Sequence, residues 1–204
     1  MNNEISSREI YGTPIKYLSK ARLLELLSQS EIISDFDPEL IIEETIFSPT
    51  GEPITVGAYQ LRVNKVVPIE GVPEDFNKVE ILPQSGQNFL TTSTVDLREN
   101  LHLKAPIYYS RQIAEQLNLY AQTPTVFSKY GITKIPQAEY SQGLVPMGEV
   151  KPGFMGRIVL EMGNTSGSPV AIQNSDILGL LIFEETEDQF EPYQGNHQGQ
   201  YVID

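Results

Sequence analysis

Cysteine and tryptophan are both absent from the 204 residues, and only two histidines are present, His102 and His197. The absence of cysteine excludes a disulfide framework, a thiolate metal site and a cysteine nucleophile. The two histidines lie far apart and have no neighbouring ligands at the spacing of a metal site, so we interpret each as a surface residue. The Gly-x-x-x-x-Gly-Lys-Ser/Thr pattern of a phosphate-binding loop is also missing. We therefore predict no metal centre built by the protein.

Long apolar runs are missing as well. The longest run, Ile177 to Phe183, has the length of a strand, whereas a membrane-spanning helix needs about 18 or more apolar residues. The first residues, Met1 to Ile5, lack the basic and apolar regions of a signal peptide. We expect no membrane partner and a cytoplasmic location. A chain of this length buries about 70% of its unfolded surface, so one core and one domain are expected.

Positive charge is scarce, with 14 Lys and Arg against 27 Asp and Glu and a formal net charge of −13. Because nucleic-acid binding uses Lys and Arg to displace condensed counterions, this balance argues against a nucleic-acid partner. It also disfavours a highly charged anionic ligand unless the charge is locally inverted or Mg²⁺ accompanies the ligand. We interpret the acidic run from Glu184 to Asp188 as a solvated loop, with a cation site as the alternative.

The spacing of apolar residues predicts two short helices and several strands. Leucines at helical spacing predict a helix over 18–29, which ends before Pro38. A second helix is predicted over 110–122, with Ser110 as its N-cap. Alternation and β-forming residues predict strands over 54–67, 79–82 and 88–95. Because no long helices separate these strands, parallel βαβ wrapping is not expected.

Residues 153–183 read as a turn followed by a β-hairpin, with one acidic residue, Glu161, inside the apolar run Arg157-Ile-Val-Leu-Glu-Met162. A carboxylate is costly to bury unless it is paired, and such surroundings raise its pKa toward the range useful for proton transfer. Glu161 is therefore a candidate general base. The alternative is that Glu161 points to solvent, because successive strand residues face opposite sides.

Three motifs occur in the same order as in one known family. They are the stretch Gly153-Phe-Met-Gly-Arg-Ile-Val-Leu-Glu-Met-Gly-Asn164, the pair Ser34-Asp-Phe-Asp-Pro-Glu-Leu40 and Gly57-Ala-Tyr-Gln-Leu-Arg-Val63, and the tail Pro192-Tyr193 with Tyr201. Together they resemble the dCTP deaminase and dUTPase superfamily over about residues 18–201. The resemblance implies a distorted jelly-roll or β-clip-type domain over 18–204. It leaves an N-terminal extension, 1–17, an insertion within 104–148 and a flexible tail, 192–204.

The resemblance also implies roles for individual residues. It makes Glu161 the base that activates the attacking water, and it assigns Phe154 and the tail residues Tyr193, Gln200 and Tyr201 to nucleotide binding. Gln200 stands where the family has Lys. The tail either closes over the nucleotide or is disordered, as its Gly- and Gln-rich composition allows.

A family helix with the pattern Arg-Ser-Ser-Leu-Ala-Arg-Leu-Gly-Leu supplies the second half of the site. Two registers fit this chain: residues 110–119, which brings in Arg111, or residues 128–132, which brings in Lys129. Neither register recovers the full Arg and Ser set. The resemblance further implies a homotrimer with sites between subunits.

These residues support hypotheses from different classes. In the first hypothesis, the chain binds and hydrolyses dCTP or dUTP, by deamination or by diphosphate release, with Mg²⁺ as the one cofactor expected. Alternatively, it is a catalytically inactive trimer of the same fold that senses nucleotides or serves a structural role. A third interpretation is a jelly-roll assembly protein of phage or virion type that shares only the β architecture.

Overall fold

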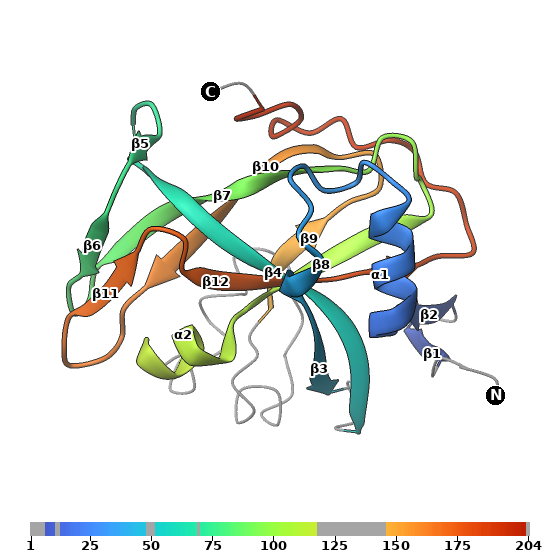
Figure 1. Cartoon of the computed structure of the whole chain (residues 1–204), viewed down its shortest axis with the longest axis horizontal. Helices are drawn as coiled ribbons and strands as arrows, with labels where there is room; N and C mark the ends of the chain where they lie inside the picture. Colours follow the sequence, from blue (N-terminus) through green and yellow to red (C-terminus); the bar gives the residue numbers. More distant parts are fainter. Residues whose placement is uncertain (1–6, 11–12, 48–51, 69, 118–145, 203–204) are drawn as a thin grey trace.

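The computed structural model describes residues 7–10, 13–47, 52–68, 70–117 and 146–202. The predicted mainly β fold with two short α-helices is confirmed (Figure 1). The strands run in chain order as β1 (Ser7–Ile10), β2 (Thr13–Tyr17), β3 (Ile41–Phe47), β4 (Pro53–Val67), β5 (Glu74–Asp75), β6 (Lys78–Ile81), β7 (Gly86–Asp96), β8 (Leu103–Tyr109), β9 (Pro146–Val150), β10 (Met155–Gly163), β11 (Val170–Gln173), β12 (Ile177–Ile182) and β13 (Glu184–Glu185).

The two α-helices lie within the ranges 18–29 and 110–122 that the sequence predicts. In α1 (Lys20–Ser28), the Ser19 hydroxyl accepts a hydrogen bond from the Arg22 N–H at 3.3 Å, and the helix buries Leu23 and Leu27. In α2 (Arg111–Gln116), Ser110 is the N-cap, as expected. Residues 118–122 of the second predicted helix lie outside the described residues. A short 3₁₀ helix, η1 (Pro38–Leu40), follows the N-cap Asp37.

The strands form one large antiparallel sheet with the order β1-β2-β13-β8-β12-β4-β7-β10, to which β3, β5 and β9 attach at the side. A separate two-stranded sheet joins β11 to β6. The 15-residue β4 is central because it pairs with β3, β12, β5 and β7 along its length. Its predicted alternation is confirmed, since Tyr59, Leu61 and Val63 are buried and Arg62 between them is exposed.

The two family-like motifs at residues 34–40 and 57–63 pack on each other. The Phe36 ring lies 6.0 Å from the ring of Tyr59 in β4, and Arg62 approaches Asp37 at 3.6 Å. Gly57 in β4 lies under the start of α1, where an added Cβ would come within 2.8 Å of the Lys20 backbone. A larger residue at this position would therefore push the helix off the strand.

The predicted hairpin over 153–183 is wrong, although its strands exist. β10 pairs with β7, β11 pairs with β6, and β12 lies between β4 and β8, so these three consecutive strands do not pair with one another. The physical reason is that each is apolar enough to be buried by strands from elsewhere in the chain. β12 buries Leu178 through Ile182 on both of its faces, a pattern typical of an interior strand.

The solvated-loop interpretation of the acidic run is wrong for its first residue. Glu184 begins β13, between β2 and β8, and is only 3% exposed. Its carboxylate lies 2.9 Å from the Lys104 ammonium. Burial raises the pKa of Glu184, and Lys104 opposes that effect. Among the residues that the structure describes, no helix is both long and apolar enough to cross a membrane.

Candidate functional site

A cavity of about 830 Å³ lies between the β8–β9 pair and β10, beneath the C-terminal segment. Its walls come from the end of β4, the start of β7, strands β8, β9 and β10, the turn between β9 and β10, and the tail. Five residues named from the sequence line it together, namely Phe154, Glu161, Tyr193, Gln200 and Tyr201. They come from segments that are separate in the chain, so the fold brings them to one place.

Strand β10 presents Glu161 to this cavity. Burial alternates along the strand, with Leu160 and Met162 facing the core and Glu161 exposed. The expectation of a carboxylate buried among apolar neighbours is therefore wrong, and the solvent-facing alternative is confirmed. The exposed face of this strand is nevertheless the wall of the cavity. Glu161 is open to an incoming ligand and to water.

Glu161 is supported through its backbone by a neighbouring strand. The Tyr109 hydroxyl, in β8, donates a hydrogen bond of 2.6 Å to the Glu161 carbonyl oxygen. Tyr109 is 7% exposed and also lines the cavity. Because β8 and β10 are not paired in the sheet, this bond is a direct link between the two walls.

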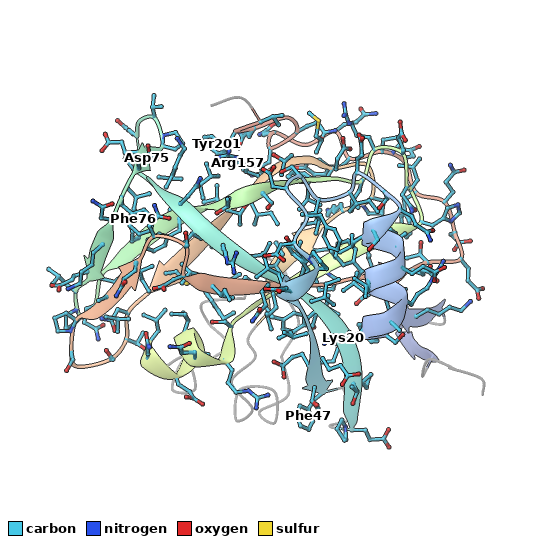
Figure 2. The ribbon with its side chains drawn as sticks, in the orientation of Figure 1. Lys20, Phe47, Asp75, Phe76, Arg157 and Tyr201 are labelled. Atoms are coloured by element: carbon cyan, nitrogen blue, oxygen red, sulfur yellow. The ribbon has the colours of Figure 1, made fainter. Side chains whose placement is uncertain are left out.

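A bulge shapes β10 on the other side of Glu161. The pairing of β10 with β7 shifts register between Arg157 and Val159. At the shift, the buried Thr91 hydroxyl accepts a 2.9 Å hydrogen bond from the Ile158 N–H and so replaces a bond of the ladder. Arg157 lies on the same face as Glu161 and lines the cavity, with its Nε and Nη1 atoms buried. Figure 2 labels it beside Tyr201, under the tail.

The predicted turn before β10 is a type II turn. The Phe154 N–H donates to the Lys151 carbonyl at 3.1 Å, Pro152 stands at the second position, and Gly153 has a φ of +78°. That positive φ is what the third position of this turn requires, and glycine adopts it without steric cost. The turn places Lys151 and Phe154 at the mouth of the cavity.

The C-terminal segment runs beside β10 (Figure 1) and contacts this turn and β10. Its residues Tyr193, Gln200 and Tyr201 line the cavity. Backbone N–H groups of the tail donate from Tyr193 to Pro152 at 2.9 Å and from Gly199 to Met155 at 2.8 Å. The Gln198 amide donates to the Gly153 carbonyl at 2.9 Å. The ring centroids of Phe154 and Tyr193 lie 5.8 Å apart. These contacts order the described part of the tail against the turn and β10, and its closing over a nucleotide stays a prediction.

Charged groups of both signs surround the cavity. Its described lining contains Lys151 and Arg157 together with Glu149 and Glu161. Glu149 also lies 3.3 Å from Lys104, which in turn contacts Glu184. Burial by itself would lower the pKa of Lys104, but the charges of Glu184 and Glu149 outweigh burial and hold that pKa above its usual value. Lys104 therefore stays an ammonium and is shared by two carboxylates.

The two registers for the second half of the site have different outcomes. Arg111 stands at the start of α2, where its guanidinium lies 3.0 Å from the Glu44 carboxylate, and it is not among the residues lining the cavity. Lys129 lies outside the described residues, so the register that uses it stays a prediction. The structure thus brings Glu161, Phe154 and the tail together and leaves Arg111 elsewhere within one chain.

Some lining residues were not predicted from the sequence. Arg157 could have been found, because residues 157, 159 and 161 share one face of a strand. Lys151, in the turn before β10, and His197, which is exposed as expected, also line the cavity. Gln87 and Asn88, at the start of β7, add two amides. Nothing in their local sequence signals that β7 pairs with β10.

The described residues that line the cavity do not form a metal site from protein ligands alone. The described part of the chain contains no group of three or more His, Asp or Glu that could hold one. Mg²⁺ commonly binds through one or two carboxylates together with substrate phosphates. The expectation that Mg²⁺ arrives with the phosphates of a ligand stays a prediction.

Comparison with known proteins places the chain at the level of the fold. No protein-family model matches the sequence, and no curated protein matches it either. The structure is similar to the crystal structure of 2′-deoxycytidine 5′-triphosphate deaminase from Agrobacterium tumefaciens, with a TM-score of 0.50 and 10% sequence identity. The match covers 83% of this chain and 48% of that one, so the chain spans about half the length of the deaminase. At this identity the likeness shows the fold alone.

Proposed function

We propose that the cavity binds a pyrimidine deoxynucleotide of the dCTP or dUTP class and hydrolyses it, with Glu161 as the general base. The observation that carries this proposal is the placement of Glu161 in one cavity with Phe154, Tyr193, Gln200 and Tyr201. The sequence motifs nominate these residues independently of the cavity. The similarity to a solved dCTP deaminase supports the same class of ligand.

Each part of the cavity has a chemical role in this proposal. The rings of Phe154, Tyr193 and Tyr201 offer apolar faces against which a pyrimidine stacks. The amides of Gln87 and Asn88 offer both donors and acceptors to the edge of a base. The tail, which carries two of the aromatic rings, limits the access of bulk water to the cavity. Polar interactions between the ligand and the cavity are stronger when water is excluded.

In deamination, the Glu161 carboxylate takes a proton from a bound water while the water oxygen bonds to C4 of the cytosine ring. The C4–N4 bond then breaks, the protons pass to the departing nitrogen, and ammonia and a uracil base are formed. In the other reaction of the class, the activated water attacks phosphorus and diphosphate leaves. Both reactions are hydrolytic and need no redox partner. Mg²⁺, where it takes part, arrives with the phosphates.

The proposal includes assembly into a homotrimer, in which neighbouring copies complete each site. Support for it comes from the resemblance and from the site itself, because the described lining supplies only two cations, Lys151 and Arg157, to stabilise the charge on the transition state. A general base alone does not suffice for catalysis, since developing charge also needs positioned hydrogen-bond donors. Arg111 and the segment around Lys129 are the candidates for that second half.

Binding without turnover is the second candidate function, as a nucleotide sensor or a structural trimer. The observation that favours it is the position of Arg111, which contacts Glu44 and does not line the cavity. A phosphate-binding arginine that is engaged elsewhere would leave the site able to bind a base but poorly able to stabilise charge.

Thermal shift and turnover assays with dCTP, dUTP, dTTP and their monophosphates, each with and without Mg²⁺, test the proposal. The variant Glu161→Gln keeps the size of the side chain but removes the base, so we expect it to bind the nucleotide and to lose turnover. Glu99→Gln is the matched control, because Glu99 is exposed and is not among the residues lining the cavity. Stabilisation without product in the wild type would favour the sensor, and no stabilisation by any nucleotide would refute the proposed function.

A further inference from the structure

The cavity walls carry a charge balance that restricts the number of phosphates on a ligand. Two cations, Lys151 and Arg157, face two carboxylates, Glu149 and Glu161, so the formal charges of the described lining cancel. Lys104 lies behind Glu149, but its charge is already shared between Glu149 and Glu184. The chain as a whole carries −13. Such a protein repels a polyanion at long range and offers it little compensation on arrival.

Only one of the two cations is well presented to a ligand. Lys151 is exposed at the mouth of the cavity, and within the described chain it takes part in no ion pair. Its backbone is fixed by the type II turn, through the 3.1 Å bond from the Phe154 N–H to its carbonyl. Arg157 is less exposed than Lys151, its Nε and Nη1 atoms are buried, and its side chain already interacts within the chain. One ammonium at the mouth suits one phosphate group.

We propose that the ligand of this cavity is a pyrimidine nucleoside monophosphate rather than a triphosphate, with Lys151 as the cation that binds its phosphate. This inference rests on the proposed function, in which a pyrimidine nucleotide occupies the cavity. A phosphate monoester carries a charge of about −1.5 to −2 at neutral pH, which one lysine largely offsets. Each further phosphate adds negative charge near Glu149 and Glu161 without a matching cation in the described walls.

The inference has a consequence for the reaction. Release of diphosphate requires a ligand with at least two phosphates beyond the first, which a monophosphate lacks. Deamination needs only the base, whose C4 would face Glu161 while Lys151 holds the phosphate at the cavity mouth. A monophosphate ligand therefore selects deamination from the two hydrolytic reactions of the class.

Binding of deoxycytidine, dCMP and dCTP, measured by calorimetry without divalent cations and at low ionic strength, tests the inference. We expect dCMP to bind most tightly, and we expect Lys151→Gln to weaken dCMP about tenfold, the effect of losing one charge-assisted hydrogen bond. The same variant should leave deoxycytidine binding unchanged, since the nucleoside has no phosphate for Lys151. Lys78→Gln is the control, because Lys78 is an exposed lysine of β6, paired with Glu80, outside the cavity lining.

Three outcomes would overturn all or part of the inference, and they differ in what else they overturn. If dCTP binds as tightly as dCMP or more tightly, cations from outside the described walls complete the site, and only the monophosphate inference is lost. If none of the three ligands binds, the proposed function is lost as well. Equal weakening of nucleoside and monophosphate by Lys151→Gln would mean that this lysine shapes the cavity instead of binding phosphate.

Discussion

Replacing Gly153 with alanine should detach the tail from the cavity. Gly153 has a φ of +78°, and a Cβ built on it would lie 2.6 Å from the Pro192 Cα and 2.8 Å from the Tyr193 nitrogen. Those neighbours are backbone atoms, so they cannot rotate away as a flexible side chain would. The left-handed backbone alone costs an alanine about 1–2 kcal/mol. Either the turn changes its conformation or the tail moves.

Movement of the tail would break the hydrogen bonds from Tyr193 to Pro152 and from Gln198 to Gly153, each worth roughly 0.5–1.5 kcal/mol net. We therefore expect Gly153→Ala to lower the free energy of unfolding by about 2–5 kcal/mol in total, or less if the tail detaches before the sheet unfolds. Urea denaturation measures the first effect. Limited chymotrypsin digestion measures the second, because detachment exposes Tyr193 to cleavage.

Gly167→Ala is the matched control for this substitution. Gly167 is exposed, has no positive φ, and an added Cβ there would meet nothing within 4 Å. We expect the control to unfold and to digest like the wild type. The reasoning would be refuted if Gly153→Ala stayed within about 0.5 kcal/mol of the wild type and its tail resisted the protease equally well.

Three further predictions concern helix packing, the support of the base and pH. Gly57→Ala should destabilise the protein by about 1–3 kcal/mol, through overpacking against the start of α1, and should lower the urea midpoint. Tyr109→Phe should lower the free energy of unfolding by about 1–3 kcal/mol, because it leaves the Glu161 carbonyl without the Tyr109 donor. It should also lower kcat more than it raises KM. A loss of stability with unchanged kcat would contradict the role of Tyr109 in positioning Glu161. Hydrogen bonds from Arg98 hold the pKa of Asp96 below its usual range, so this pair contributes stability above the unfolded pKa of about 3.9 and loses it as pH falls through the lower folded pKa. Asp96→Asn should therefore be less stable than the wild type at neutral pH and equally stable in strong acid, as urea midpoints across that range would show.

The local elements of this fold were predictable because their signals are local. Ser110 caps α2 with its own hydroxyl, and β4 shows its buried face through the alternation around Leu61 and Arg62. Partners were not predictable in the same way. The apolar residues of β10 and β12 predict burial, but nothing in them specifies that β10 pairs with β7, a strand about seventy residues earlier in the sequence, instead of with its neighbour. That is why the predicted hairpin failed.

The residues of the candidate site likewise fall into those that local sequence predicts and those that it does not. Glu161 and the tail tyrosines were named because motif spacing is a property of the sequence. The exposure of Glu161 could not be decided from the apolar run around it, since either face of the strand was compatible with that pattern. Lys151 and Asn88 enter the site only because a turn and a distant strand carry them there. Their roles depend on tertiary pairing that no short motif encodes.

The junction of β2 and β13 bears on how the nascent chain folds. Tyr17 in β2 is opposite Glu184 in β13, and Lys16 contacts Glu187 at 3.2 Å across 171 residues of sequence. The edge of β2 that pairs with β13 therefore stays unpaired until almost all of the described chain has left the ribosome. Contacts this distant slow folding into the range of milliseconds to seconds and expose edges that aggregate. Nascent chains that stall before β13 should depend on chaperones, and the cavity, covered by the residues that follow β13, should be among the last parts of the molecule to form.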